Sequence, residues 1–376
     1  MTEEKGVKVR ETAIRCVLRI EESKSYANIV VPKIIQEASL DIRDRNLVSE
    51  IAYGSTRMKR SLDWAIDRFL PQSPPPPLRA ALRVGAYQIL FMRVPAHAAV
   101  SATVSASSKR NKGVVNAVLR KISNEEHIDW PSDSIRLSYP EWILNRLAND
   151  LGEEESIRMM EMMNRSPNVT KRSDGYIQDQ ASQWIANLIH PEKEDLILDL
   201  CAAPGGKATA LANKAFLVVA SDISASRQRL VTKNIGTLRL DNVLQVIGNG
   251  ETPPYRTETF DKVLVDAPCS GLGVLHRRAD ARWRIKEDDL ESLAELQLKL
   301  LSSAVELVKP GGELIYSVCT VTRAETINIA TELERLHPGL NPVQLQDTRW
   351  RQVKGGLQIL PQDHGTDGMT IFKWVV

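Results

Sequence analysis

The C-terminal part of the chain is predicted to form an α/β fold, a mostly parallel sheet with helices on both faces, and the N-terminal part an all-helical domain. From Ile177 onward, apolar runs of strand length alternate with amphipathic helical patterns, an order that favours right-handed crossovers between parallel strands. Within 195–211, a buried strand leads through Pro204-Gly205-Gly206 into the start of a helix. Only glycine lets a backbone come so close to a bound molecule, so this turn is the expected ligand site.

Length and composition indicate an ordinary globular protein of two or three domains. The chain has 376 residues, of which 43% are apolar and 26% charged. No signal peptide is recognised at the start, and no apolar run approaches the roughly 18 residues of a membrane span. The four cysteines lie far apart without a CxxC pair, which is typical of reduced thiols in the cytosol and argues against zinc. We therefore expect a cytoplasmic monomer without a metal site or a membrane partner.

The first 124 residues are predicted to be a basic helical domain. They carry 21 Lys and Arg against 11 Asp and Glu, a net charge of +10, and the remainder carries 28 against 36, a net charge of −8. Helical periods cover 8–70, 78–91, 98–108 and 114–122, and a proline block at 71–77 is expected to be a surface loop. The charge favours a polyanionic partner such as nucleic acid, although a merely solvated basic surface explains it equally well.

Residues 125–172 are predicted to be a helical connection, and 173–376 the α/β domain. Helices are expected over 141–151 and 153–163, the second with methionines that fill a core. Strands of the α/β domain are expected over 196–200, 216–220, 243–247, 262–265 and 313–318, helices over 226–238, 289–308 and 324–336, and a last β segment over 371–376.

Polar residues gather where these strands end, at Asp199–Lys207, Asp222, Asn249, Asp266–Ser270 and Cys319. Ligands of such sheets bind at the carboxyl ends of the strands. Asp222 follows the first strand by some twenty residues, where an acid bonds the ribose of an adenosine-containing ligand. Since the turn is not GxGxxG, a nicotinamide cofactor is the weaker prediction. The alternative for Asp222 is a surface side chain that caps the helix after Ser224.

Two cysteines and a carboxylate are expected to converge in this cleft. Asp266 and Cys269 end the fourth strand and Cys319 the fifth, and neighbouring strands lie about 4.8 Å apart. A single cysteine is more often a small buried apolar residue, but two beside an Asp favour catalysis. A thiolate that adds to carbon 6 of a cytosine makes carbon 5 nucleophilic enough to take a methyl group from a sulfonium donor. A carboxylic group on ring nitrogen 3 favours that addition, and a second group assists elimination of the thiol.

Three motifs in order, DLCAAPGGK (199–207), VDAPCSGLGVLHRRADARW (265–283) and YSVCTV (316–321), resemble the RsmB/Sun RNA cytosine-5 methyltransferases. The segments 40–64, 82–91, 94–100 and 113–122 resemble the NusB-like RNA-binding domain of the ribosomal RNA members. The resemblance implies a Rossmann-like class I methyltransferase domain, with a mostly parallel seven-stranded sheet, after an all-α NusB-like domain.

The resemblance also implies roles for individual residues. Cys319 corresponds to the nucleophile, Cys269 to the thiol that assists product release, and Asp266 to a residue that binds the target cytosine. The residues that correspond to the S-adenosylmethionine site are Cys201, Ala202, Ala203, Pro204, Gly205, Gly206, Lys207, Asp222, Asn249 and Asp266. The segment 176–182 resembles the approach to that site. Arg277, Arg278, Arg282 and Trp283 are expected RNA contacts, by charge and stacking.

Three features depart from the family pattern. Asn249 stands in place of an Asp that binds the adenine, with weaker cofactor binding as the expected cost. Val318 replaces a hydroxyl residue before the nucleophile. Between Asn164 and Tyr176 the relatives carry an RRM-like α+β subdomain that helps to hold RNA, and here 167–175 is only a short polar link.

The leading hypothesis is an S-adenosylmethionine-dependent methyltransferase that acts on carbon 5 of a cytosine in small-subunit (16S) ribosomal RNA through a covalent Cys-cytosine intermediate. A ribosome-assembly factor that binds RNA and keeps the methyltransferase half as a scaffold is an alternative, which the missing subdomain and Asn249 favour. A cytosine-5 methyltransferase for transfer RNA keeps the chemistry and changes the substrate.

Overall fold

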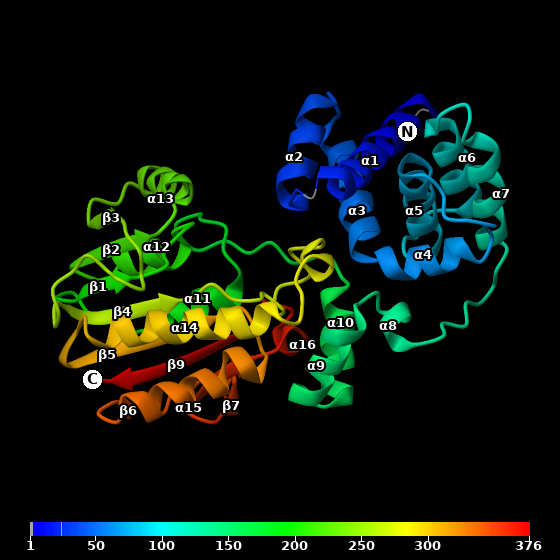
Figure 1. The fold of residues 1–376 in the computed structure, drawn as a ribbon. Helices are drawn as coiled ribbons and strands as arrows, with labels where there is room; N and C mark the ends of the chain where they lie inside the picture. Colours follow the sequence, from blue (N-terminus) through cyan, green and yellow to red (C-terminus); the bar gives the residue numbers. More distant parts are fainter. Residues whose placement is uncertain (1–2, 24) are drawn as a thin grey trace. The chain divides into compact units, whose positions relative to one another are not determined.

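In a computed structural model of the chain, which describes residues 3–23 and 25–376, the polypeptide forms two compact units (Figure 1). The first, here called the helical unit, comprises the residues up to Ser166 together with Leu275–Arg284. The second, the sheet unit, comprises Pro167–Val274 and Ile285–Val376. The segment Leu275–Arg284 therefore belongs to the helical unit, although in sequence it lies between two strands of the sheet unit.

The helical unit contains helices and no strand among its described residues, as predicted. Its elements are α1 (Glu3–Ser23), α2 (Ala27–Glu37), α3 (Ile42–Arg57), α4 (Lys59–Asp67), α5 (Pro76–Leu90), α6 (Ala96–Ala106), α7 (Lys112–Ser123), α8 (Asp133–Arg136), α9 (Glu141–Leu151), α10 (Glu153–Met163) and the 3₁₀ turn η1 (Ala281–Trp283). The Asp41 carboxylate caps α3 by accepting a hydrogen bond from the backbone N–H of Asp44 at 2.9 Å. Met159, Met160 and Met163 are fully buried, which confirms them as core residues.

Two apolar clusters hold the first seven helices together. One joins α1, α2 and α3 through side chains such as Val17 and Ile51, with Val84 of α5. The other joins α4, α5, α6 and α7 through side chains such as Leu82, Val100 and Leu119. Each cluster lies on the apolar stripe of its helices, because residues three and four apart share one helix face. The helical period in the sequence therefore predicts the elements of this unit well.

The sheet unit is built on one mostly parallel sheet, as predicted. Its strands are β1 (Leu196–Asp199), β2 (Leu217–Asp222), β3 (Val243–Ile247), β4 (Phe260–Asp266), β5 (Val308–Val318), β6 (Asn341–Pro342), β7 (Arg351–Val353), β8 (Gly356–Ile359) and β9 (Met369–Val375). Along the sheet the order is β3-β2-β1-β4-β5-β9-β8-β7, with β6 also paired to β9. The first five strands are parallel, and β9, β8 and β7 are antiparallel. Nine strands are thus formed by the described residues instead of seven, because 341–359 adds short strands with little apolar alternation.

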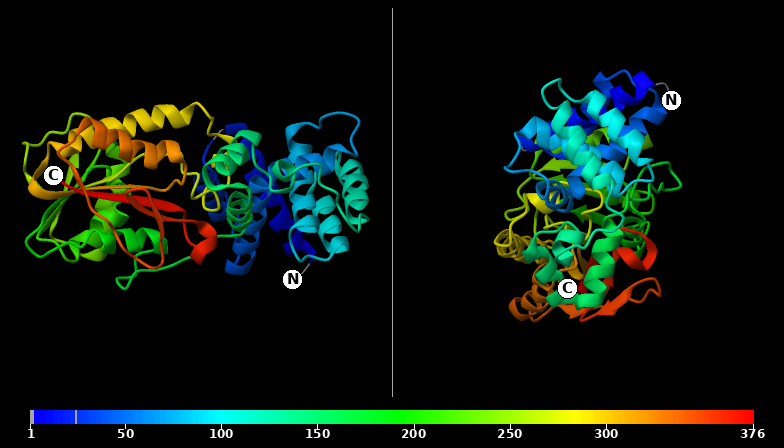
Figure 2. Two further views of the ribbon diagram at one scale, coloured as in Figure 1. Left: turned by 90° about the horizontal axis from the view of Figure 1, so that it is seen from below. Right: turned by 90° about the vertical axis from the view of Figure 1, so that its right-hand side faces the viewer.

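Helices cover both faces of the sheet. They are α11 (Gln180–Leu188), α12 (Gly206–Ala212), α13 (Ala225–Leu238), α14 (Asp289–Val305), α15 (Ile327–Leu336) and α16 (Pro361–His364), with the 3₁₀ turn η2 (Arg323–Glu325). In the left view of Figure 2, the yellow and orange helices α14 and α15 lie on one side of the strands and green helices on the other.

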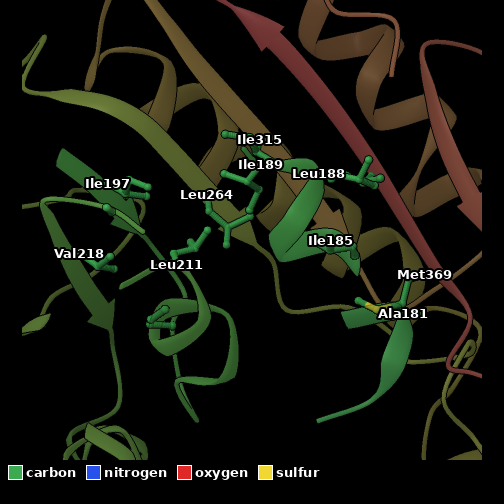
Figure 3. Close-up of a cluster of buried hydrophobic side chains, with 14 of the residues drawn as sticks. Ala181, Ile185, Leu188, Ile189, Ile197, Leu211, Val218, Leu264, Ile315 and Met369 are labelled. Atoms are coloured by element: carbon green, nitrogen blue, oxygen red, sulfur yellow. The ribbon is translucent and has the colours of Figure 1, made fainter. Parts of the chain in front are cut away.

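Successive residues of each central strand enter opposite apolar clusters. Ile197 and Leu264 belong to the cluster formed with α11 and α12, and Figure 3 labels both together with Ile185 and Leu211 of the same cluster. Their neighbour Leu198 faces the second cluster, formed with α14 and α15. Side chains of a strand alternate between its faces, so strands buried on both sides must be apolar at nearly every position. This explains the unbroken apolar runs from which the sheet was predicted.

Between α10 and α11 the chain forms a short link. Among residues 164–179, all of which the structure describes, the only β pairing is a single bridge between Lys171 and Ile177. Among the described residues, no helix is both long enough and apolar enough to cross a bilayer.

Candidate active site

The parallel strands β1, β4 and β5 bring the predicted polar residues to one edge of the sheet. β4 pairs with β5, with Asp266 opposite Ser317, so the expectation that these two strands are neighbours is confirmed. β4 also pairs with β1, whose last residue is Asp199. Since the carboxyl ends of parallel strands lie at the same edge, Asp199, Asp266, Cys269 and Cys319 form one group. In the described residues, no group of three or more potential metal ligands is present.

The turn after β1, residues 201–207, is here called the cradle. Gly205 has φ +99°, a left-handed conformation in which a Cβ would lie 3.2 Å from the Val231 side chain. At Gly206 a Cβ would meet the Gln178 amide at 3.2 Å and the Tyr176 ring at 3.4 Å. The carbonyl of Pro204 accepts a hydrogen bond from the Asn234 amide at 2.8 Å, which fixes the turn on α13. The two glycines therefore let the turn pack closely against α13 and against Tyr176 and Gln178 of the preceding link.

The link before the cradle supports it through Arg172, a residue that the sequence analysis did not select. The Arg172 guanidinium donates hydrogen bonds to the Gly206 carbonyl at 2.7 Å and to the Thr209 hydroxyl at 3.1 Å. It also lies over the Tyr176 ring, 4.7 Å from the centroid, and pairs with Asp174. The segment 176–182 therefore leads to the glycine turn, as expected. The only signal in the sequence was a cation in a short polar link.

Asp222, at the end of β2, is buried, with 2% of its surface exposed. One carboxylate oxygen accepts from the Ala203 N–H at 3.2 Å, and the other accepts from the Ser224 N–H at 2.9 Å. The Ser224 side chain caps α13, by accepting from the Arg227 N–H. The alternative of a surface Asp that caps this helix is therefore wrong, and the carboxylate fixes the cradle from the second strand. Asn249, two residues after β3, uses its Oδ1 to accept from the Glu251 N–H at 3.0 Å.

An ion pair joins the cradle to β4. The Lys207 ammonium lies 2.6 Å from Oδ2 of Asp266, and the Ser317 hydroxyl donates to Oδ1 of Asp266 at 2.7 Å. Lys207 is buried, and burial alone would lower its pKa. The adjacent Asp266 carboxylate, with smaller contributions from Cys319 and Asp199, instead raises the pKa of Lys207. The lysine therefore stays a cation in the centre of the site.

The carboxyl group of Asp199 is buried close enough to this pair to interact with both charges. Asp199 is 1% exposed, and neither carboxyl oxygen has a well-formed hydrogen bond within the described chain. Burial and then the charge of Asp266 raise the pKa of Asp199 to about 8, although Lys207 and the Cys201 backbone oppose the change. Asp199 therefore carries a proton at neutral pH, since an unpaired carboxylate would be costly here.

Asparagine at position 199 is expected to alter the pH dependence of stability. The folded-state pKa is raised, so the protonated carboxyl favours folding fully below the unfolded pKa near 3.8, and this contribution is lost as pH rises to about 8. Relative to the wild type, Asp199→Asn should therefore gain free energy of unfolding between pH 5 and 8, by at most about 1.4 kcal/mol per pH unit. Urea unfolding of both proteins at pH 5 and pH 8 measures the free energies of unfolding. If the variant differs from the wild type by the same amount at both pH values, the protonated state of Asp199 is contradicted.

The two predicted cysteines are adjacent. The Sγ atoms of Cys269 and Cys319 lie 3.3 Å apart, and both residues are partly exposed. The hydrogen bond with Cys319, burial, and the charges of Cys319 and Glu325 all raise the pKa of Cys269. Cys201 lies in the cradle, and burial, followed by nearby carboxylates, raises its pKa as well. The Cys319 thiol is therefore near the Lys207 ammonium, and the Cys269 thiol is near the buried Glu325 carboxylate.

Of the residues expected to contact RNA, Arg282 is a structural residue instead. It is fully buried in the helical unit, stacks 3.9 Å from the Tyr139 ring centroid and donates to the Ser138 carbonyl. Trp283 is half-buried, and its indole N–H donates to the Thr56 carbonyl. Only Arg278 of the four is exposed, while Arg277 is half-buried. Charge in the sequence could not distinguish these environments.

The chain is similar to methyltransferases over nearly its whole length. A family model described as 16S rRNA methyltransferase RsmB/F matches residues 186–374, and the NusB family matches 7–124. The chain is 29% identical to the probable ribosomal RNA small subunit methyltransferase B of Bacillus subtilis, over 98% of each protein. It is 32% identical to the putative methyltransferase Rv1407 of Mycobacterium tuberculosis, over 96% of this chain and 94% of that one. The Bacillus alignment spans 442 positions, more than this chain has residues, as expected if a subdomain is missing here.

Two solved structures share the fold. The crystal structure of PH0851 is similar with a TM-score of 0.80, at 22% identity, over 99% of this chain and 98% of that one. A methyltransferase homolog protein from Pyrococcus horikoshii is similar with a TM-score of 0.54, at 22% identity, over 65% of this chain and 97% of that one. Fold and family together define an S-adenosylmethionine-dependent methyltransferase. More particularly, the chain belongs to the RsmB/F family and is an RNA methyltransferase with a NusB-like domain.

Proposed function

We propose that the protein methylates carbon 5 of a cytosine in 16S ribosomal RNA through a covalent bond between Cys319 and carbon 6 of that base. The observation that carries the proposal is the pair of thiols, 3.3 Å apart, at the ends of two strands beside the Lys207–Asp266 ion pair. One thiol can bond the base while the other removes the proton that must leave carbon 5. The RNA substrate follows the names of the curated relatives, which are small-subunit ribosomal RNA methyltransferases.

The charges around the thiols support Cys319 as the nucleophile. Lys207, whose pKa is raised in part by Cys319, places a cation near this sulfur and favours its thiolate. The pKa of Cys269 is raised instead, first by its hydrogen bond with Cys319 and by burial and then by the charges of Cys319 and Glu325, so Cys269 keeps its proton. Once Cys319 is bonded to the base and no longer anionic, one obstacle to ionising Cys269 disappears. Cys269 can then take the proton from carbon 5 as the Cys319–carbon bond breaks.

Asp266 is proposed to hold the cytosine. Its carboxylate is partly exposed and already oriented by Lys207 and by the Ser317 hydroxyl. A carboxylate in this place can accept a hydrogen bond from the exocyclic amine of cytosine, and the protonated group can donate to ring nitrogen 3. Bonding to nitrogen 3 draws charge from carbon 6 and favours attack by the Cys319 thiolate. The target base must be unpaired or flipped out to reach these groups.

The residues around the glycine turn fit S-adenosylmethionine, which supplies the methyl group when bound. The glycine turn lies between the end of β1 and the start of α12, where ligands of such sheets bind, and the buried Asp222 carboxylate is at the strand end that suits a ribose. We assign Cys201–Lys207, Asp222, Asn249 and Asp266 to this site. The functional division is 1–124 for RNA binding, 125–172 as a connection and 173–376 for catalysis.

Aspartate at position 249 is expected to strengthen cofactor binding. The Asn249 Oδ1 is already engaged by the Glu251 N–H, whereas a carboxylate keeps that bond and offers a second acceptor to the adenine amine. One added hydrogen bond is worth about 0.5–1.5 kcal/mol, so Asn249→Asp should lower the dissociation constant of S-adenosylmethionine roughly 2- to 10-fold. Calorimetry measures this, with Asn341→Asp on exposed β6 as the control. An unchanged or higher constant would remove Asn249 from the adenine site.

The same calorimetry tests the alternative of an assembly factor with an inactive methyltransferase half. The short link and Asn249 favour that alternative, and the intact thiol pair and glycine turn oppose it. If S-adenosylmethionine shows no binding to the wild-type chain, the scaffold explanation replaces the enzyme. Methyl transfer to transfer RNA but not to 16S ribosomal RNA fragments would support the other alternative.

A further inference from the structure

Glu325 is fully buried in the sheet unit, next to the loops that carry Cys269 and Cys319. It ends the 3₁₀ turn η2, six residues after Cys319, and no part of its surface is exposed. A buried carboxylate in the interior of a protein is costly unless several donors satisfy it. Because it is fully covered, Glu325 cannot touch the RNA or the cofactor. Any effect on the reaction must therefore pass through its neighbours.

The carboxylate joins the residue after one cysteine to the residue after the other. Its Oε1 accepts from the Ser270 N–H at 2.7 Å, and its Oε2 accepts from the Ser270 hydroxyl at 2.5 Å. The Thr320 hydroxyl also lies 3.1 Å from Oε2 and 3.1 Å from the Ser270 hydroxyl. Ser270 directly follows Cys269, and Thr320 directly follows Cys319. One side chain thus fixes the backbone on which both thiols stand.

Further bonds hold the carboxylate itself in place. The Thr322 hydroxyl donates to Oε2 at 3.0 Å, and the Gln297 amide donates to Oε1 at 3.2 Å. The same amide donates to the Pro268 carbonyl at 2.9 Å, and the Tyr316 hydroxyl donates to the Glu325 carbonyl at 2.7 Å. Hydrogen bonds to a charged acceptor are about twice as strong as neutral ones. The network therefore spans α14, β5 and both cysteine loops.

We propose that Glu325 is a positioning residue for methyl transfer, which fixes the loops after Cys269 and Cys319 and thereby holds the two thiols in contact. Its charge adds to the hydrogen bond with Cys319 and to burial, which raise the pKa of Cys269 more. The assignment of Cys319 as nucleophile rests on the proposed function; the positioning itself rests on the contacts above. The charged and titratable groups around the thiols come from every adjoining element. They are Lys207 of α12, Asp199 of β1, Asp266 of β4, Tyr316 of β5 and Glu325 of η2. Lys207 favours an anion on Cys319, and Glu325 opposes one on Cys269.

The test compares the pH dependence of alkylation of each cysteine by iodoacetamide in wild type, Glu325→Gln and Glu334→Gln, read by peptide mass spectrometry. Glu334 is a matched control, since it is a half-buried glutamate on α15 that bonds the Trp374 indole. In wild type, Cys319 should react at lower pH than Cys269. Loss of the Glu325 charge should move the Cys269 midpoint to lower pH, because that charge is one of the causes that raise its pKa. Glu334→Gln should leave both profiles unchanged.

If Glu325 served only the stability of the fold, Glu325→Gln would lower the melting temperature and leave the alkylation midpoints of both cysteines unchanged. That result would overturn the proposal. Should Glu325→Gln not fold, Ser270→Ala combined with Thr320→Val keeps the charge and removes the hydroxyls that join the loops. Ellman's reagent, a disulfide, then reports on thiol contact. The first thiol displaces one thionitrobenzoate, and the second attacks the mixed disulfide and releases another.

Closure of the Cys269–Cys319 disulfide by this route should be at least roughly 10-fold slower in the double variant than in wild type, and equal rates would contradict the positioning. Neither assay contains RNA or S-adenosylmethionine. Failure of the proposed function would appear as absent methyl transfer with these thiol results intact. Failure of the Glu325 proposal would appear as unchanged thiol results in a protein that still methylates RNA.

Discussion

Replacing Cys319 with alanine is expected to lower the rate of methyl transfer to RNA by on the order of 10⁴-fold or more. Among the described residues, no other group can take the place of this thiol at the end of β5. The remaining thiol, Cys269, follows β4, and its sulfur lies 3.3 Å from the place of the lost one. Transfer of a tritiated methyl group from S-adenosylmethionine to 16S ribosomal RNA fragments measures the loss. The affinity for S-adenosylmethionine should change little, since Cys319 lies outside the cradle.

Cys16→Ala provides the matched control for this substitution. Cys16 is fully buried in the helical unit, and burial raises its pKa to about 12, so it takes no part in thiolate chemistry. This variant should keep wild-type activity once its folding has been verified by circular dichroism. Full activity in Cys319→Ala would show that the covalent mechanism is wrong.

Replacing Cys269 with alanine should have the opposite signature, a covalent protein–RNA complex that accumulates. Cys319 can still add to the base and carbon 5 can still be methylated, but the group 3.3 Å away that removes the proton is gone. We expect turnover to fall roughly 10²- to 10⁴-fold, in the range of a lost general base. A denaturing gel should show a band of protein plus labelled RNA that survives boiling in detergent.

The double variant Cys269→Ala/Cys319→Ala separates this adduct from nonspecific cross-linking. It should give no band, because the atom that bonds the base is absent. A band of equal intensity in the double variant would mean that the adduct does not form at Cys319. Rapid turnover without an adduct in Cys269→Ala would assign proton removal to another group.

The fold was largely predictable because its signals are local. Apolar runs such as 196–200 are buried on both faces of the sheet, and the helical periods of the N-terminal part give stripes that form its two clusters. Strands β6, β7 and β8 were not predicted, because they are short and contain polar residues and glycines that carry no clear alternation. Their pairing depends on β9, which is distant in sequence.

The candidate site was predictable only in part, because some of its contacts join residues that are distant in sequence. Cys269 and Cys319 could be placed together because each follows a strand and parallel strands end at one edge. Glu325 could not, because its partner Ser270 is 55 residues away in sequence and hydrogen bonds across that span leave no periodic signal. Arg282 was predicted at the surface by its charge, yet the Tyr139 ring and the Ser138 carbonyl bury it. Buried charges with tertiary partners are where sequence reasoning fails.

The base specificity of the reaction tests the account most directly. The purified protein is incubated with S-adenosylmethionine carrying a tritiated methyl group and with 16S ribosomal RNA from a strain that lacks the gene, and the RNA is then digested to nucleosides and separated by chromatography. The two adjacent thiols predict that the tritium elutes with 5-methylcytidine and that Cys319→Ala yields none. Tritium on another nucleoside, or on 5-methylcytidine at an undiminished level in Cys319→Ala, would contradict methylation through a Cys319–cytosine bond.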